Sequence, residues 1–359
     1  MKGTKIEWAT NTFNPWEGCV KVSKGCANCY AETRANRYKS SKWGPHTAGA
    51  TRVVRSENYW KEAMRWGREA AWCGNRVCHP TALGRMDGHC SCGLQVERPT
   101  VFCASLADIF EQWPGFMLHS NGDPLHVCSV CGDWQTMENM CCGPTAHMPL
   151  TMNGVRGRVF NLIRATPQMD WLLVTKRPEN IAAMMPDFAT YGNNELTGEP
   201  LRRSPPWPNV WLITSVEDQP TADRRIDELL KVPAVVHGLS MEPLLEHVNL
   251  SPWLSRLGWV IVGGESGPGA RRCDLAAVKS VVDQCRAAKV PVFVKQLGAD
   301  PTLDETRVGR DGWTRISLPV RGGGDGLMHV ELDDPKGGDM GEWPEQLRVR
   351  EFPTPAIGA

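Results

Sequence analysis

Short apolar runs recur along most of the chain, and each of them ends in polar residues. Most are followed by a stretch compatible with a helix, and a segment at 5–12 offers a further strand at the start. Apolar strands that alternate with helical segments are typical of a parallel sheet buried on both faces. The pattern therefore predicts an α/β fold, a partial or complete (β/α) barrel, with strands at 101–104, 171–175, 210–215, 234–240, 259–263 and 290–295.

Polar residues at the predicted carboxyl ends of these strands are candidates for an active site. Barrels and open α/β sheets build their sites at that edge. The alternative is that strands simply end in polar turns, but repetition over six successive strands favours a site. The candidates are Ser105, Asp108, Lys176, Arg177, Ser215, Glu217, Ser240, Glu242, Gly263, Gly264, Glu265, Ser266 and Lys295.

Two regions interrupt the alternation of strands and helices. Segments at about 72–93 and 126–143 are rich in Cys, His and Gly and have little apolar periodicity, so we expect metal-organised insertions there. They would interrupt a core domain of residues 1–300. Residues 301–359 contain a Gly-rich piece at 321–326 and are expected to form a carboxyl-terminal appendage with short strands.

Composition narrows the class of protein. The 359 residues are 41% hydrophobic and 22% charged, as in soluble globular proteins. Lys plus Arg equals Asp plus Glu at 40 each, so no global charge draws the chain to nucleic acid or a membrane, although a local basic patch remains open. No signal peptide or membrane span is evident, which predicts a cytoplasmic protein whose 14 cysteines serve metals rather than disulfides.

Three cysteines follow the first predicted strand: Cys19, Cys26 and Cys29. Three thiolates suit an iron-sulfur cluster that leaves one iron to an exogenous ligand. The alternatives are a structural zinc completed by a distant ligand, and plain buried thiols. The position after the first strand favours the cluster, because the loop would then lie at the carboxyl edge of the barrel.

The two insertions carry further thiols. Four of them within twenty residues are enough for one closed tetrahedral zinc, while a second iron-sulfur cluster or uncoordinated thiols are the alternatives. These four are Cys73, Cys78, Cys90 and Cys92.

The spacing Cys128-Ser-Val-Cys131-Gly is typical of one knuckle of a zinc ribbon. Cys141 and Cys142 are the expected second pair, with His126 or His147 as substitutes. Ligand pairs could also be exchanged between the insertions, since sequence order does not give connectivity. One or two structural zinc ions are thus predicted.

Other groups offer binding chemistry. The glycines before Glu265 let backbone amides approach a ligand, and its carboxylate suits a charged amine, with a structural turn as the alternative. Lys176, Arg177 and Lys295 suit carboxylate or phosphate groups, with solvated strand ends as the alternative. Aromatic residues interleaved with arginines favour nucleic-acid binding, or else they cover a zinc-bound core; they are Trp43, Trp60, Trp66, Trp72 and Trp134 with Arg52, Arg55, Arg65, Arg68 and Arg76.

The cysteine loop resembles that of the radical S-adenosylmethionine superfamily. Six residues rather than three separate the first two cysteines, and Asn28 stands where an aromatic residue is usual, with Tyr30 after the third cysteine. More specifically, the chain resembles a phage and prophage family marked by this CX6CX2C motif. The shared segments lie at 6–8, 14–19, 26–32, 175–179, 215–219, 240–244, 263–267, 270–271, 295–296 and 336–339.

The resemblance implies a [4Fe-4S] cluster on the three cysteines, with S-adenosyl-L-methionine as cofactor and a 5′-deoxyadenosyl radical as its product. Glu265, Lys176 and Cys273 are then expected to act in catalysis, Cys273 as a hydrogen donor. Tyr30 and the strand-end residues would contact the cofactor. Cys103 and Cys285 have no partners at metal spacing and are expected to be buried.

The expected partners follow from the same resemblance. An electron donor such as a flavodoxin or ferredoxin would serve the cluster, in the host cytoplasm if the gene belongs to a phage. The phage setting and the Arg/Trp-rich segments favour modification or repair of a nucleic-acid base or nucleotide. Two alternatives stay open: a nonenzymatic zinc protein that binds nucleic acid, and a radical enzyme that acts on a small metabolite.

Overall fold

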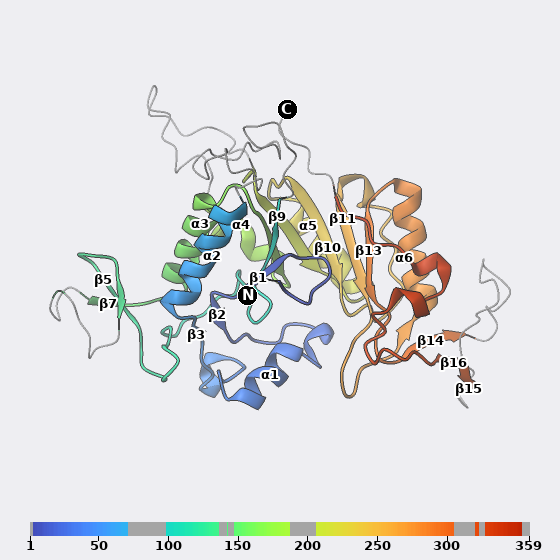
Figure 1. Ribbon diagram of the computed structural model, residues 1–359, viewed down its shortest axis with the longest axis horizontal. Helices are drawn as coiled ribbons and strands as arrows, with labels where there is room; N and C mark the ends of the chain where they lie inside the picture. The colour runs from blue at the N-terminus through green and yellow to red at the C-terminus, as the bar shows by residue number, and fades with distance from the viewer. Residues whose placement is uncertain are drawn as a thin grey trace, which may run out of the picture.

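A seven-stranded parallel sheet forms the centre of the molecule (Figure 1). The computed structural model describes residues 3–70, 98–135, 142, 147–186, 206–304, 320–322 and 327–353. Strand order in the sheet follows sequence order, and every neighbouring pair is parallel. The strands are β1 (Asn11–Phe13), β4 (Thr100–Cys103), β8 (Asp170–Thr175), β9 (Val210–Ser215), β10 (Val236–Met241), β11 (Trp259–Gly263) and β13 (Val292–Gln296).

The sheet curls into a half-barrel with β1 and β13 at its edges. This arrangement confirms the α/β class and the partial form of the predicted barrel. The first strand is shorter and later than expected, because Trp8 and Ala9 just before it pack in an apolar cluster on one face of the sheet. Each strand continues through a connection to its parallel neighbour, as sequential winding requires.

Helices cover one face of the sheet, here called the outer face. Alternate strand residues such as Leu173, Leu212 and Val262 share one core cluster with the helical residues Val159 and Ile226. These helices are α2 (Glu57–Ala70), α3 (Met152–Ala165), α4 (Ile181–Met184), α5 (Gln219–Leu229) and α6 (Leu275–Ala288), while α1 (Tyr30–Tyr38) lies beyond one edge of the sheet.

The inner face carries a second apolar cluster. Trp8 packs there against Trp259, with ring centroids 6.3 Å apart, and against Phe102 at 4.7 Å. Trp211 and Phe293 belong to the same cluster. The amino-terminal segment therefore covers part of the inner face, and the polar residues after the strands are left at its carboxyl end.

Local sequence explains where α5 begins. Asp218 accepts a hydrogen bond from the Thr221 amide at 3.0 Å, while the Asp218 amide donates to the Thr221 hydroxyl at 3.1 Å. This reciprocal capping box satisfies amides that have no partner within the helix. It also fixes the turn between β9 and α5, which lies beside the cysteine loop.

Three smaller sheets surround the half-barrel. One pairs β2 (Trp16–Glu17) with β3 (Val53–Val54), and a second is an antiparallel sheet of β5 (His126–Cys128), β6 (Trp134–Gln135) and β7 (His147–Pro149). The third sheet contains β12 (Cys273–Asp274), β14 (Pro301–Asp304), β15 (Val320–Gly322) and β16 (Leu327–Val330).

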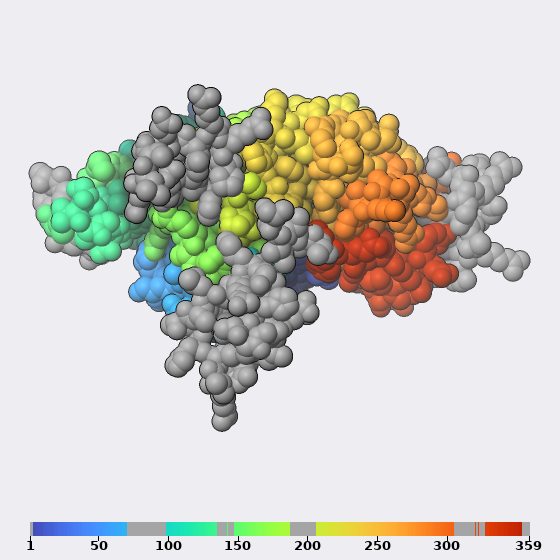
Figure 2. All heavy atoms as spheres, turned by 90° about the horizontal axis from the view of Figure 1, so that it is seen from above, coloured from blue at the N-terminus to red at the C-terminus, as the bar shows by residue number. Residues whose placement is uncertain are grey.

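The carboxyl-terminal residues include the expected short strands and also pack on the core. The Val294 amide donates to the carbonyl of Val349 at 2.9 Å, and that of Leu297 to Gly337 at 2.8 Å. Figure 2 shows these residues in red beside the orange α6, at the opposite end of the molecule from the teal β5–β7 sheet. No helix in the described ranges is long and apolar enough to cross a bilayer.

Candidate functional site

The loop 18–29, which carries Cys19, Cys26 and Cys29, lies across the carboxyl edge of the parallel sheet, where Figure 1 shows α1 following it. Its first anchor is Arg177, after β8. Arg177 Nη2 donates to the carbonyl of Val20 at 2.8 Å, and Nη1 lies 3.5 Å from Cys19 Sγ. Nη1 also donates to Asp108 Oδ2 at 2.8 Å. This buried guanidinium thus links two strand ends to the first cysteine.

The surroundings of Cys19 shift its acidity. Burial, together with the nearby Glu111 carboxylate, raises the pKa of the Cys19 thiol to about 12, and Arg177 opposes that rise. The isolated thiol is therefore protonated at neutral pH.

A second buried ion pair supports this region. Arg52 has no exposed surface and donates from Nε and Nη2 to both oxygens of Glu111, at 2.8 and 2.7 Å. Its guanidinium also lies 3.9 Å from the centre of the Trp113 ring. The sequence suggests Arg52 as one of the arginines that could bind nucleic acid. In the structure, however, its side chain is buried and paired with Glu111, so it cannot contact a phosphate.

The loop's second anchor lies after β9. Ser23 Oγ donates to Glu217 Oε1, and Arg225 Nη1 donates to the other Glu217 oxygen at 2.6 Å. Glu217 and Arg225 are both buried. A side chain at Gly25 would collide with the Glu217 carboxylate, so this position accepts only glycine at such close approach.

The third anchor follows β11. Asn28 Nδ2 donates to Glu265 Oε2 at 2.9 Å, and Arg271 Nη2 donates to Glu265 Oε1 at 2.7 Å. Burial raises the pKa of the Glu265 carboxyl. Hydrogen bonds from Arg271 and Asn28, with the charge of Arg271, lower it by more in total, so the pKa lies below its usual value. Both oxygens of this predicted cofactor contact are thus engaged by the protein.

Polar side chains lie on the inner face of the sheet at the carboxyl ends of its strands, next to the apolar cluster. Lys176 and Ser215 come two residues after Val174 and Ile213 of that cluster, and strand alternation places them on the same face. Lys176 Nζ donates to Ser215 Oγ at 3.2 Å. Both predicted residues therefore meet at the carboxyl end of β8 and β9.

A matching group lies at the ends of β10 and β13. Lys295 Nζ is 2.8 Å from Glu242 Oε1, and Ser240 Oγ donates to Glu242 Oε2 at 3.3 Å. Desolvation lowers the pKa of Lys295, but the Glu242 carboxylate together with Tyr30 and Glu7 raises it by more in total, so the lysine is charged. Tyr30, which is 58% exposed, donates from its hydroxyl to the carbonyl of Ser105 at 2.8 Å. We call Lys176, Ser215, Ser240, Glu242 and Lys295 the inner polar layer.

Other predicted residues have structural surroundings. A Cβ at Gly263 would lie 2.9 Å from the carbonyl oxygen of Gln296, and one at Gly264 would lie 2.8 Å from Cys273 Cβ. These glycines therefore allow β11 and the turn after it to pack closely. Cys273 is 1% exposed, and burial raises the pKa of its thiol to about 12. Ser266 is half-buried in the turn that follows Glu265.

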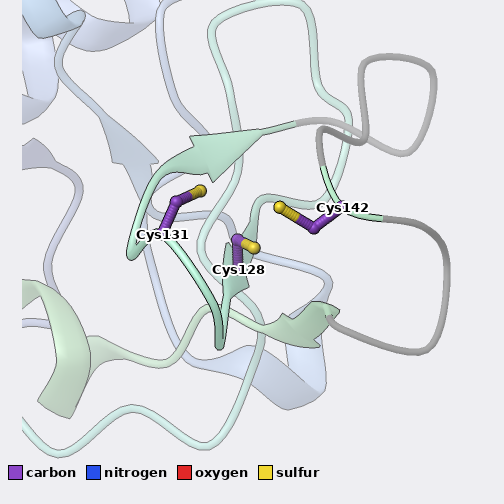
Figure 3. A group of neighbouring side chains, drawn as sticks. All are labelled: Cys128, Cys131 and Cys142. Carbon is purple, nitrogen blue, oxygen red and sulfur yellow. The ribbon is translucent and has the colours of Figure 1, made fainter.

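The second cysteine group lies in the β5–β7 sheet. The sulfur atoms of Cys128, Cys131 and Cys142 all lie within 4.8 Å of one another and could hold a metal ion (Figure 3). The expected fourth thiol, Cys141, lies outside the described residues. So do all four cysteines of the first insertion, Cys73, Cys78, Cys90 and Cys92.

Sequence reasoning missed several residues that shape the site. Asn28 stood out only as a departure from the usual loop, and Glu111 and Arg225 carried no signal at all. Asn28 and Glu111 act through partners far away in sequence, Glu265 and Arg52, whereas Arg225 pairs with Glu217 across the turn between β9 and α5. Only Gly25 offered a local hint, as a glycine inside a compact cysteine motif.

These features define a class: an α/β half-barrel protein with a three-cysteine loop anchored across the carboxyl edge of its sheet. The chain belongs to the family described as "Protein of unknown function (DUF5131)", whose model matches residues 3–116 and 146–316. The match includes the cysteine loop and all seven strands of the parallel sheet, and it leaves out residues 117–145. No curated protein and no solved structure matches the chain.

Proposed function

We propose that the protein is a radical S-adenosylmethionine enzyme of the host cytoplasm whose cluster is held by Cys19, Cys26 and Cys29. One observation carries the proposal: the loop with these three cysteines is fastened across the carboxyl edge of a half-barrel, next to the inner polar layer. Sites in barrel folds form at that edge. A half-barrel of the radical S-adenosylmethionine type suits such a loop.

The donor set fits a cluster better than a single ion. Zinc, with bonds of about 2.3 Å in a tetrahedron, gathers its sulfurs roughly 3.8 Å apart. In the described part of the chain, only Cys128, Cys131 and Cys142 form a group of three within 4.8 Å, so the loop's sulfurs are more widely spaced. A four-iron cube takes one thiolate at each of three corners, which suits ligands that stand apart.

The chain's own residues would prepare this site. Arg177 donates toward Cys19 and so would offset the negative charge of a thiolate ligand. Asn28, Glu265 and Arg271 hold the loop against β11. When bound, the cluster and S-adenosyl-L-methionine would supply one-electron chemistry that ends in hydrogen abstraction from the substrate.

The inner polar layer is suited to anionic groups. Lys176 and Lys295 lie on the same face of the sheet and could pair with the carboxylate of the cofactor or with a phosphate. Glu265 was expected to accept the cofactor's amine. Because both of its oxygens already accept hydrogen bonds from protein groups, we assign it to holding the loop instead.

A basic helix beside the loop supports a nucleic-acid base or nucleotide as substrate. Tyr38 at the end of α1 is 65% exposed, and the guanidinium groups of Arg34 and Arg37 lie 5.5 and 5.8 Å from its ring. Lys39 follows directly, and Lys42 comes three residues later. An exposed aromatic ring among cations can stack a base and hold phosphates, and it provides a local patch on a chain without net charge.

The test is anaerobic reconstitution followed by reduction in the presence of S-adenosyl-L-methionine. We expect about four iron atoms per chain and 5′-deoxyadenosine formation that increases with DNA, RNA or nucleotides, identified by mass spectrometry of the products. Cys26→Ala should abolish both, and Cys285→Ala, in a buried helical position, should change neither. Iron-free protein whose loop binds only zinc would refute the proposal.

A further inference from the structure

We propose that Cys128, Cys131, Cys142 and His147 hold one zinc ion that cross-links the β5–β7 sheet, whose Trp134 packs on the outer helices. This inference is independent of the proposed radical chemistry. It begins from three sulfur atoms that already point toward one another (Figure 3) and lie within 4.8 Å. Tetrahedral zinc needs them roughly 3.8 Å apart, so these three sulfurs require only small shifts, whereas the ring nitrogens of His147 lie outside this group and the ring would turn toward it when the ion binds.

The backbone between the first two cysteines builds the knuckle. The Gly132 amide donates to the carbonyl of Cys128 at 2.8 Å, and the Cys128 amide donates to that of Asp133 at 2.9 Å. Gly132 has a φ of 76°, which glycine adopts more readily than other residues. This tight turn brings Cys131 back beside Cys128, as a chelating pair requires.

The strand register supplies the fourth ligand. β5 and β7 are antiparallel, and His147 stands directly opposite Cys128. Side chains at opposite positions share a face of the sheet, with Cβ atoms about 4.5–5.5 Å apart. His126 lies two residues before Cys128 on β5, opposite Pro149 of β7 and Gln135 of β6. His147 therefore has the shorter reach to an ion beside Cys128.

Cys141 was the expected fourth ligand from the sequence. Side chains of successive residues point in different directions, so two adjacent cysteines do not easily bind one ion. Cys142 already points toward Cys128 and Cys131. Three thiolates and one imidazole complete a closed tetrahedral site of the kind that zinc occupies in structural roles.

The sheet itself needs such a fastening. β5, β6 and β7 have three, two and three residues, which is too little pairing and burial to be stable without other support. The three cysteines also fall within residues 117–145, the interval that the family match leaves out. We therefore infer that the ion stabilises a module added to the family's half-barrel.

The ion would hold one wall of a cavity. Trp134 on β6 packs edge-on against Trp60 of α2, with ring centroids 5.7 Å apart. The Arg158 guanidinium on α3 lies 4.5 Å from the Trp134 ring and 4.6 Å from the Trp60 ring. A cavity of about 660 Å³ lies here, lined by Cys131, Asp133 and Trp134 on one side and by residues of α2 and α3 on the other. Loss of the metal should release Trp134 from this contact.

The experiment compares zinc content among variants of the full chain. Cys128→Ser/Cys131→Ser/Cys142→Ser should contain one zinc fewer than the natural protein, with iron unchanged. Any zinc bound by the first insertion is present in both proteins, so it does not affect the difference in zinc content between them. His147→Ala should keep the three thiolates but bind zinc on the order of 100-fold more weakly, as expected for one of four ligands. Cobalt substitution should show a spectrum of three sulfurs and one nitrogen.

Matched variants decide the ligand assignment. His126→Ala, two residues before Cys128 on the same strand, and Cys141→Ser should leave zinc affinity unchanged. Weakening by either one while His147→Ala binds normally would overturn the role of His147, and full zinc content in the triple variant would overturn the site.

A chelator provides a readout that needs no folded variant. Zinc removal from the natural protein should increase hydrogen exchange in 126–135 and 147–149 and leave 170–175 and 210–215 protected. Unchanged exchange in the β5–β7 sheet would contradict the fastening role.

Discussion

Two groups of three cysteines lie in this chain, and their surroundings differ in almost every respect. The thiols of Cys19, Cys26 and Cys29 stand apart on a loop held by charged groups from three strand ends. The thiols of Cys128, Cys131 and Cys142 are gathered within 4.8 Å on a small antiparallel sheet. Metal sites that react keep an open position, whereas structural sites are closed. The comparison teaches that the neighbours of the cysteines, more than their number, distinguish the two roles.

The two regions also differ in their relation to the family. The loop belongs to the matched part of the chain, while the knuckle falls in the interval that the match leaves out. Its teal sheet projects at one end of the molecule in Figure 2. We infer that reaction chemistry belongs to the shared half-barrel and that the knuckle is an addition to it.

The largest expected effect is a double dissociation of the two metals. Cys26→Ala should lose essentially all iron and keep the zinc of the knuckle, because a two-cysteine loop cannot hold a four-iron cluster. Cys131→Ser should lose one zinc and keep its iron. Elemental analysis of both variants after anaerobic reconstitution is the measurement. Loss of zinc instead of iron from Cys26→Ala would make the two groups the same kind of site.

The next largest effect concerns Arg177. Arg177→Gln leaves the buried Asp108 carboxylate without its partner, so we expect the free energy of unfolding to fall by about 3–5 kcal/mol. Arg256→Gln breaks an exposed pair with Asp227 and should cost about 0–1 kcal/mol. Chemical denaturation measures both. Equal costs would show that the ion pairs beneath the loop are no more important than surface pairs.

A smaller effect is expected at the inner polar layer. Lys295→Met removes a cation beside Glu242 and should weaken S-adenosyl-L-methionine binding roughly tenfold, a loss of about 1.4 kcal/mol. Lys231→Met, in an exposed pair with Glu228, is the control and should bind normally. Calorimetry under anaerobic conditions measures the affinity. Unaltered binding by Lys295→Met would show that the cofactor does not bind at this face. Zinc content should be the same in the natural protein and in both variants.

The smallest effect is a pH dependence confined to the loop. The pKa of Glu265 is lowered in the folded protein, so its ionised form stabilises the fold above its ordinary value of 4.5, and this contribution is lost as the pH falls through the lower folded pKa. We expect hydrogen-exchange protection of 20–30 to decline below pH 4.5. Glu265→Gln should remove that dependence without changing the pH at which the knuckle releases zinc. A decline that persists in Glu265→Gln would assign it to another group.

Much of the half-barrel could be predicted from apolar runs alone. β8 and β9 lie where the sequence indicates them, because strands buried on both faces are apolar at nearly every position. The first strand could not be placed correctly in the same way. The segment 5–12 reads as a strand, yet Trp8 packs across the inner face and β1 begins only at Asn11. Apolar periodicity reports burial and does not report which element buries a side chain.

The sequence by itself determined the alternation of strands and helices, both cysteine motifs and the polar residues at the carboxyl edge, since these depend on neighbours a few positions apart. Tertiary structure alone decided how those residues are used. Glu265 binds Asn28 across 237 positions and Arg52 binds Glu111 across 59, so one candidate ligand also anchors the loop and one candidate phosphate contact is a buried ion pair. Such pairings depend on which charges the fold removes from water together, and no local pattern records that.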